Sequence, residues 1–120
     1  MTIYLGYFNS EKAKEAEHPL LHEPHNHYFD GFDIRDKNLR EEIKNLDIIV
    51  AIYEYGNFEG KAFVLYKKDG KLFEVNDYHC SCNGLSIWDP EETSKEALLK
   101  RPWESLLNDG DKVRLAIESI

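Results

Sequence analysis

The dipeptide Asp69-Gly70 lies between two runs of β-favouring residues, and no other feature restricts the fold of this chain as strongly. Both central residues of a type I′ turn have positive φ, and Asp-Gly is among the pairs that accept this conformation. The sequence therefore predicts a β-hairpin that joins Lys61–Lys68 to Lys71–Asn76 through a two-residue turn. Such a turn places Val64 opposite Val75 in the ladder.

Apolar residues occupy both faces of this hairpin. Side chains alternate along a strand, so one face carries Ala62, Val64, Tyr66, Phe73 and Val75, and the other carries Phe63, Leu65, Leu72 and Glu74. A sheet with one face in water would alternate apolar and polar residues. We therefore expect the hairpin to be covered on both sides or to lie centrally in a sheet.

Further strands and helices are predicted on either side of the hairpin. The strands, which are rich in β-branched and aromatic residues, are Ile3–Phe8, Ile48–Tyr55 and a last strand in which Val113, Leu115 and Ile117 alternate with other residues. The helices, which follow capping signals, are Glu11–Glu17 after Asn9-Ser10, Leu39–Leu46 with Asn38 and Glu41 as a capping box, a helix from Asp89-Pro90 to Lys100, and a short helix that opens at Pro102. Gly56–Gly60 is predicted to be a loop. The expected fold is α+β, with a mostly antiparallel sheet of about four or five strands, three or four helices and a metal-binding loop.

The size and composition suit one domain, residues 1–120. The chain is 42% hydrophobic, which is enough for a core of its own. Its longest apolar run, Ile48–Tyr53, is far shorter than the roughly 20 residues that span a bilayer. The N-terminus has neither a basic nor an apolar segment of the kind that opens a signal peptide. We therefore expect a soluble, cytoplasmic protein without membrane contact.

The formal net charge is −8, and residues 1–60 carry 12 acidic side chains against 6 lysines and arginines. Binding to nucleic-acid backbones depends on clustered basic residues, and the sequence has no such cluster. The charge therefore argues against direct nucleic-acid binding and favours a partner protein with a basic surface. A simpler alternative is that the charge only keeps a small domain soluble.

The segment His79-Cys80-Ser81-Cys82 contains both cysteines of the chain. Thiolates and imidazoles are the usual ligands of Zn²⁺ in proteins. Three such groups within so short a segment predict a zinc site formed by His79, Cys80 and Cys82. Asn83-Gly84 favours a turn directly after Cys82, so we expect these ligands to lie in a loop rather than in a strand.

A structural zinc site needs a fourth ligand. Most of the histidines lie between residues 18 and 27, where Pro19 and Pro24 favour a loop. We take His25 as the fourth ligand. The alternatives are His22, His27, Asp77, Glu91, Glu92 and, for an open site, water. These histidines would also suit an ordinary polar surface loop.

Other chemistry of the cysteine pair stays open. Cys80 and Cys82 can pack as small apolar side chains, or form a strained disulfide that cytosolic reductants oppose. Cys80 could also be a nucleophile with a histidine as its base, although no nucleophile elbow or protease signature is present. The His-x-Glu and Pro-Cys-x-x-Cys pattern of zinc deaminases is absent as well. We favour the metal site.

The stretch from Tyr55 to Leu99 resembles a module that recurs in small proteins of phages and prophages. The shared segments are, in chain order, Tyr55–Gly60, Ala62–Leu65, Lys68–Asn76, His79–Cys82, Gly84-Leu85, Trp88 and Pro90–Thr93. The combination of His-Cys-Ser-Cys with Trp-x-Pro-Glu-Glu-Thr is the specific part. Residues 51–100 would thus contain the hairpin, metal loop and helix of the module, and residues 1–50 would hold the specific function.

This resemblance implies a phage-encoded, zinc-binding inhibitor of a host defence nuclease, similar in kind to zinc-containing anti-CRISPR proteins that act on the type II effector. Such an inhibitor would block nucleic-acid loading by occupying a basic surface, and complementary charge would speed its association. The expected contact residues are acidic: Asp30, Asp33, Asp36, Glu41, Glu42 and Asp47. The alternatives are a regulatory or host-adaptation binding module with a structural zinc and a small metal-dependent enzyme. We predict no catalytic residue.

Overall fold

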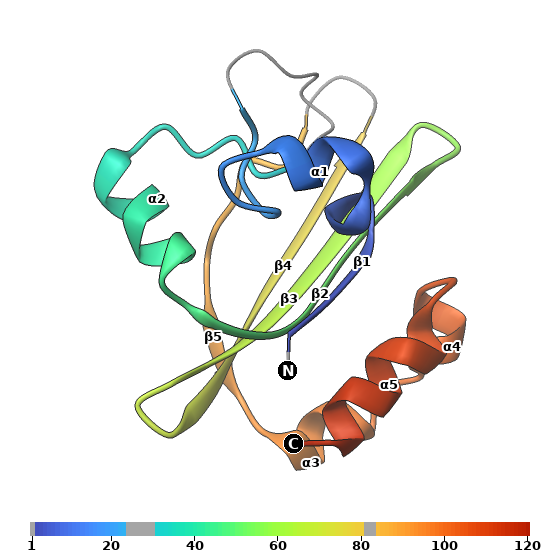
Figure 1. Ribbon diagram of the computed structural model, residues 1–120. Helices are drawn as coiled ribbons and strands as arrows, with labels where there is room; N and C mark the ends of the chain where they lie inside the picture. The colour runs from blue at the N-terminus through green and yellow to red at the C-terminus, as the bar shows by residue number, and fades with distance from the viewer. Residues whose placement is uncertain (1, 24–30, 81–83) are drawn as a thin grey trace.

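The computed structural model describes residues 2–23, 31–80 and 84–120, and within them it has one five-stranded sheet, five α-helices and one 3-10 helix. The strands lie side by side in chain order: β1 (Ile3–Gly6), β2 (Asp47–Gly56), β3 (Glu59–Lys68), β4 (Lys71–Cys80) and β5 (Glu91–Thr93). β1 runs parallel to β2, and every other neighbouring pair is antiparallel. The predicted α+β fold with a mostly antiparallel sheet is confirmed (Figure 1), with more helices than expected.

The β3–β4 hairpin forms as the sequence predicts. Asp69 and Gly70 have φ of 53° and 76°, so both central turn positions are left-handed. Val64 pairs with Val75 across the ladder. The local turn chemistry therefore sets the register between β3 and β4.

A second hairpin replaces the loop expected at Gly56–Gly60. Asn57 and Phe58 are its turn, with φ of 52° and 65°, and Glu59 already belongs to β3. The expectation was wrong because the second position of a type I′ turn is usually glycine, and Phe58 does not announce such a turn.

Helices and loops cover the sheet on both faces (Figure 1). One face packs against η1 (Tyr7–Asn9), α1 (Glu11–Glu15), α2 (Lys37–Lys44) and the loops around them, through buried residues that include Phe8, Leu20, Leu21, Phe32, Ile43 and Leu85. The other face packs against α3 (Lys95–Leu99), α4 (Trp103–Leu106) and α5 (Gly110–Glu118), through Leu98, Trp103, Leu107, Val113, Ala116 and Ile117. The prediction that both hairpin faces are buried is thus confirmed.

The predicted last strand is wrong, because those residues form α5. Val113, Ala116 and Ile117 are buried, whereas Leu115 is 62% exposed. Val113 and Ile117 are four residues apart, a spacing that fits one face of a helix as well as one face of a strand. The packing against the sheet selects the helical alternative.

The predicted helix from Asp89 to Lys100 is also wrong in its first half. Glu91–Thr93 form β5, which pairs with Leu72–Glu74 of β4. The helix α3 begins only after Ser94, whose hydroxyl accepts a hydrogen bond from the Ala97 amide. Ser94, and not Asp89, is therefore the N-cap.

The helix α2 begins two residues earlier than the capping-box pattern indicates. The Asp36 carboxylate accepts hydrogen bonds from the amides of Asn38 and Leu39 at 2.8 and 3.2 Å. Asp36 is thus the N-cap, and Asn38 lies inside the first turn. The predicted helix near Glu11 is confirmed, with the Ser10 hydroxyl as its cap.

Candidate functional site

The end of β4 carries two of the predicted zinc ligands, His79 and Cys80. The expectation that they lie in a loop is wrong, because β4 continues through Cys80. The second hairpin is the reason: it extends β3 back to Glu59, which pairs with Cys80, while Gly60 pairs with His79. The other two predicted ligands, Cys82 and His25, lie outside the described residues, as does the alternative ligand His27.

The His79 ring is buried and bonded through both of its nitrogens. Its Nδ1 lies 2.7 Å from the carbonyl oxygen of Cys80, and its Nε2 lies 2.6 Å from the hydroxyl of Tyr53. A carbonyl oxygen can only accept, so Nδ1 carries the proton of the neutral ring. The Tyr53 hydroxyl then donates to Nε2.

Gly60 makes room for this ring. A Cβ at that position would collide with the His79 imidazole, so no larger residue fits without displacing it. The ring also stacks on Tyr55, with centroids 5.6 Å apart and an interplanar angle of 17°. Because Tyr55, Gly60 and His79 are successive partners across three strands, the sheet register itself builds this contact.

The Cys80 side chain lies on the opposite, exposed face of β4. Tyr78 shares that face, and its hydrogen bond to Glu59 raises the pKa of the phenol, with smaller contributions from burial and from the charges of Glu59 and Cys80. His79 and Cys80 therefore diverge. The structure does not bring these two predicted ligands to one point.

The surroundings of His79 suit a zinc ion only in part. Cysteine and histidine are suitable donors for zinc. An Nδ1–H bonded to a carbonyl is also how zinc-binding histidines are commonly oriented, with Nε2 free for the metal. Here Tyr53 holds Nε2 instead. Within residues 2–23, 31–80 and 84–120, no group of three or more His, Cys, Asp or Glu side chains could hold a metal ion.

The alternative ligands in the described part of the chain have other positions. The Asp77 carboxylate accepts hydrogen bonds from the amides of Ser86 and Ile87 at 2.9 and 3.1 Å. Glu91 and Glu92 lie on β5, where Glu92 pairs with Lys71 at 3.3 Å. The Nδ1 atom of His22 is buried and has no hydrogen-bond partner among the described residues.

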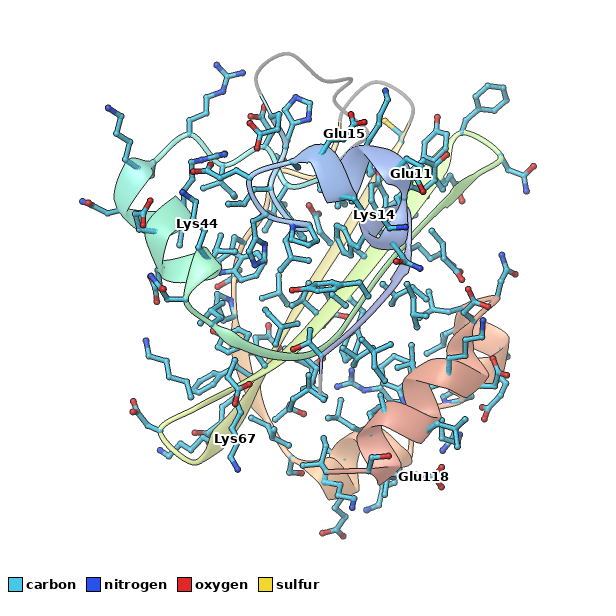
Figure 2. All side chains as sticks on the ribbon, viewed as in Figure 1. Glu11, Lys14, Glu15, Lys44, Lys67 and Glu118 are labelled. Carbon is cyan, nitrogen blue, oxygen red and sulfur yellow. The ribbon has the colours of Figure 1, made fainter. Side chains whose placement is uncertain are left out.

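The predicted contact acids lie on and around α2, apart from Asp30, which is outside the described residues. Glu41 pairs with Lys44 at 2.9 Å, Glu42 with Lys68 at 3.4 Å, and Asp33 with Arg35 at 3.4 Å. Asp36 caps the helix, and Asp47 is exposed at the start of β2. Basic residues such as Lys44 (Figure 2) are interleaved with these acids, so the α2 surface is mixed rather than uniformly negative.

An apolar groove of about 540 Å³ on the other face of the sheet was not predicted from the sequence. Its apolar lining residues are Ala62, Phe63, Tyr78, Ile87, Trp103, Leu106 and Leu107. They come from β3, β4, the segment before β5 and the α4 region, so only the tertiary structure assembles them. The sequence feature that could have indicated this groove is the pair of adjacent leucines, Leu106 and Leu107. In the structure, Leu107 is buried and Leu106 is 45% exposed.

Comparison of the chain with family models, curated proteins and solved structures found no match. Among the helices in the described part of the chain, none has the length and apolar character needed to cross a membrane.

Proposed function

We propose that this protein is a phage-encoded, zinc-binding inhibitor of a host defence nuclease of the type II CRISPR class. It binds its partner through protein–protein contact and blocks nucleic-acid loading. The proposal joins the phage-module resemblance to the acidic charge of the chain, and it uses Cys80 and Cys82 as zinc ligands. The contact surface is α2 with the acids at its two ends.

The exposure of α2 carries this proposal. The side chains of Glu41 and Glu42 are 67% and 54% exposed, and their lysine partners lie on the same surface. Exposed ion pairs contribute about 0–1 kcal/mol each. A partner with basic side chains can therefore exchange these pairs for intermolecular ones at little cost, and the long-range charge of the chain would steer the encounter.

Charge reversal with a matched control tests the contact. The variant Glu41→Lys/Glu42→Lys/Asp47→Lys breaks the ion pairs of Glu41 with Lys44 and of Glu42 with Lys68, and it reverses the charge of Asp47, which forms no ion pair with the described residues. The control Glu92→Lys/Glu96→Lys/Glu118→Lys changes the net charge equally and also breaks two exposed pairs, with Lys71 and Lys100. Glu118 lies on the C-terminal helix, on the far side of the sheet from Lys44 (Figure 2).

The readout is DNA cleavage by a type II effector that is mixed with the inhibitor before its guide RNA and target DNA are added, at several inhibitor and salt concentrations. We expect the α2 variant to lose at least about tenfold in potency and the control to lose much less. Equal losses in the two variants would show that only net charge matters. No inhibition by the wild-type protein would refute the proposed function as a whole.

A further inference from the structure

Phe58 lies at the tip of the β2–β3 hairpin, and its backbone conformation is unfavourable for a bulky residue. Its φ of 65° lies in the left-handed region, where a bulky side chain is disfavoured. The side chain is 75% exposed, the highest exposure among the large apolar residues in the described part of the chain. Glycine would relieve the backbone, and a polar residue would remove the exposed apolar surface. Strained positions of this kind cluster at functional sites, and an exposed phenylalanine at such a position suits an intermolecular apolar contact.

The apolar groove is a suitable recess for such a side chain. Its volume of about 540 Å³ exceeds that of a phenylalanine side chain several-fold. Buried Phe63 and Trp103 are in its lining, and exposed Tyr78 and Ile87 lie along it. Apolar surface that stays open to water in this way commonly marks an interaction site.

The hairpin tip and the groove belong to one continuous surface. A neighbouring polar depression is lined by Asn57 and Glu59 at the tip and also by Lys61, Leu106 and Leu107, which line the groove. One face of the molecule therefore presents both a protruding apolar side chain and an apolar recess. In a two-fold contact, the projection of each copy meets the recess of the other.

Glu59 and Lys61 are one pair of opposite charges on this surface that a second copy can match. Lys61 forms no ion pair with any residue that the structure describes. Glu59 follows Phe58 directly, so it would come close to the Lys61 of a second copy when Phe58 enters that copy's groove. The charged lining residues of the groove are Lys61 and Asp77, which cancel. The polar depression adds Glu54 and Glu104, so the surface as a whole is acidic, and the apolar contacts have to outweigh some charge repulsion.

We propose that the protein forms a two-fold dimer in which Phe58 of each copy inserts into the apolar groove of the other, with Glu59 facing Lys61 across the interface. The exposed parts of Phe58, Tyr78, Ile87 and Leu106 supply on the order of 400 Å² per copy, about half of what a standard interface buries on each side. The interface is therefore small, of the size that weak or transient complexes have. This dimer does not depend on the proposed inhibition.

Sedimentation analysis of the purified chain tests the dimer. Reductant is present throughout, because exposed Cys80 could otherwise cross-link copies. We expect the wild-type mass to rise from 14.1 kDa toward double that value between about 1 and 300 µM. Phe58→Gly should weaken the dimer at least about tenfold. The same change should raise the melting temperature of the monomer, measured at low concentration, by about 2–5 °C.

The ion pair gives an independent readout. Lys61→Glu and Glu59→Lys should each weaken the dimer, and the double swap should restore it, because the swapped charges again face each other. Leu115→Ala, at an exposed position on α5, is the control and should leave dimerisation unchanged. A wild-type chain that stays monomeric throughout this range overturns the proposal, as does a dimer that Phe58→Gly leaves unchanged.

Discussion

Two described histidines, His18 and His79, are each oriented by hydrogen bonds to the backbone. The Nδ1 atom of His18 accepts from the Leu20 amide at 3.2 Å, and its ring stands edge-on to Tyr4, with the ring centroids 6.4 Å apart. The Nδ1 atom of His79 instead donates to a carbonyl. The two rings therefore have opposite tautomers, which the sequence around them does not reveal.

Protonation of His18 should destabilise the fold. Burial lowers its pKa, the charge of Lys44 lowers it further, and Glu17 partly offsets both. The folded pKa thus lies below the unfolded value of about 6.5, so the unfolded chain binds the proton first. The contribution of His18 to the free energy of unfolding should be fully present above about pH 6.5. It should decrease as the pH falls toward the folded pKa. Urea unfolding of the wild-type chain and His18→Gln at pH 7.5 and 5.5 checks this, and an equal pH dependence in both would contradict it.

At the scale of elements, capping side chains decide where helices begin. Asp36→Ala should lower the free energy of unfolding by about 1 kcal/mol, because two α2 amides lose their acceptor. Asn38→Ala should change it by less than about 0.5 kcal/mol, since Asn38 lies inside the first turn. The urea midpoints of unfolding of the two variants show whether Asp36 or Asn38 is the N-cap. A larger loss in Asn38→Ala would favour the capping box that the sequence suggested.

At the scale of the whole molecule, one sheet holds two separate cores together. The C-terminal helices are also tied to β4 by Arg101, whose guanidinium makes two hydrogen bonds of 2.6 and 2.7 Å to the buried carboxylate of Glu74. Burial alone would raise the pKa of Glu74, but the hydrogen bonds from Arg101, Asn76 and Thr93 lower it overall. This ion pair joins residues from distant parts of the chain, so it orients the helical layer on the sheet.

A zinc ion at the predicted site would also act at this scale. A structural zinc contributes about 10–16 kcal/mol in small peptides, comparable to the total stability of a domain, about 5–15 kcal/mol. We expect elemental analysis to find about one zinc per chain and the Cys80→Ser/Cys82→Ser variant to lose both the metal and cooperative unfolding. The variant His79→Gln shows whether His79 is a zinc ligand. The protein should retain zinc if His79 only bonds to Tyr53, and it should lose zinc if His79 binds the metal. Metal-free wild-type protein, purified without chelator, would rule out the site.

The sequence by itself determined the features that depend on neighbouring residues. Asp69-Gly70 specified the turn and register of the β3–β4 hairpin, because φ preferences act locally. The apolar residues on both hairpin faces predicted two covered layers, since side chains alternate along a strand. The cysteine spacing predicted a zinc site, which stays a prediction.

Tertiary structure decided what depends on partners distant in the chain. Glu91–Thr93 became a strand because β4 offered an edge, although their own pattern favours a helix start. Residues 113–117 form a helix because helical spacing places Val113, Ala116 and Ile117 together against the apolar face of the sheet. His79 turned inward because Gly60 and Tyr53, on two other strands, leave it space and a hydrogen bond. The free energy of such contacts exceeds the small differences in local propensity, and a local sequence pattern does not contain them.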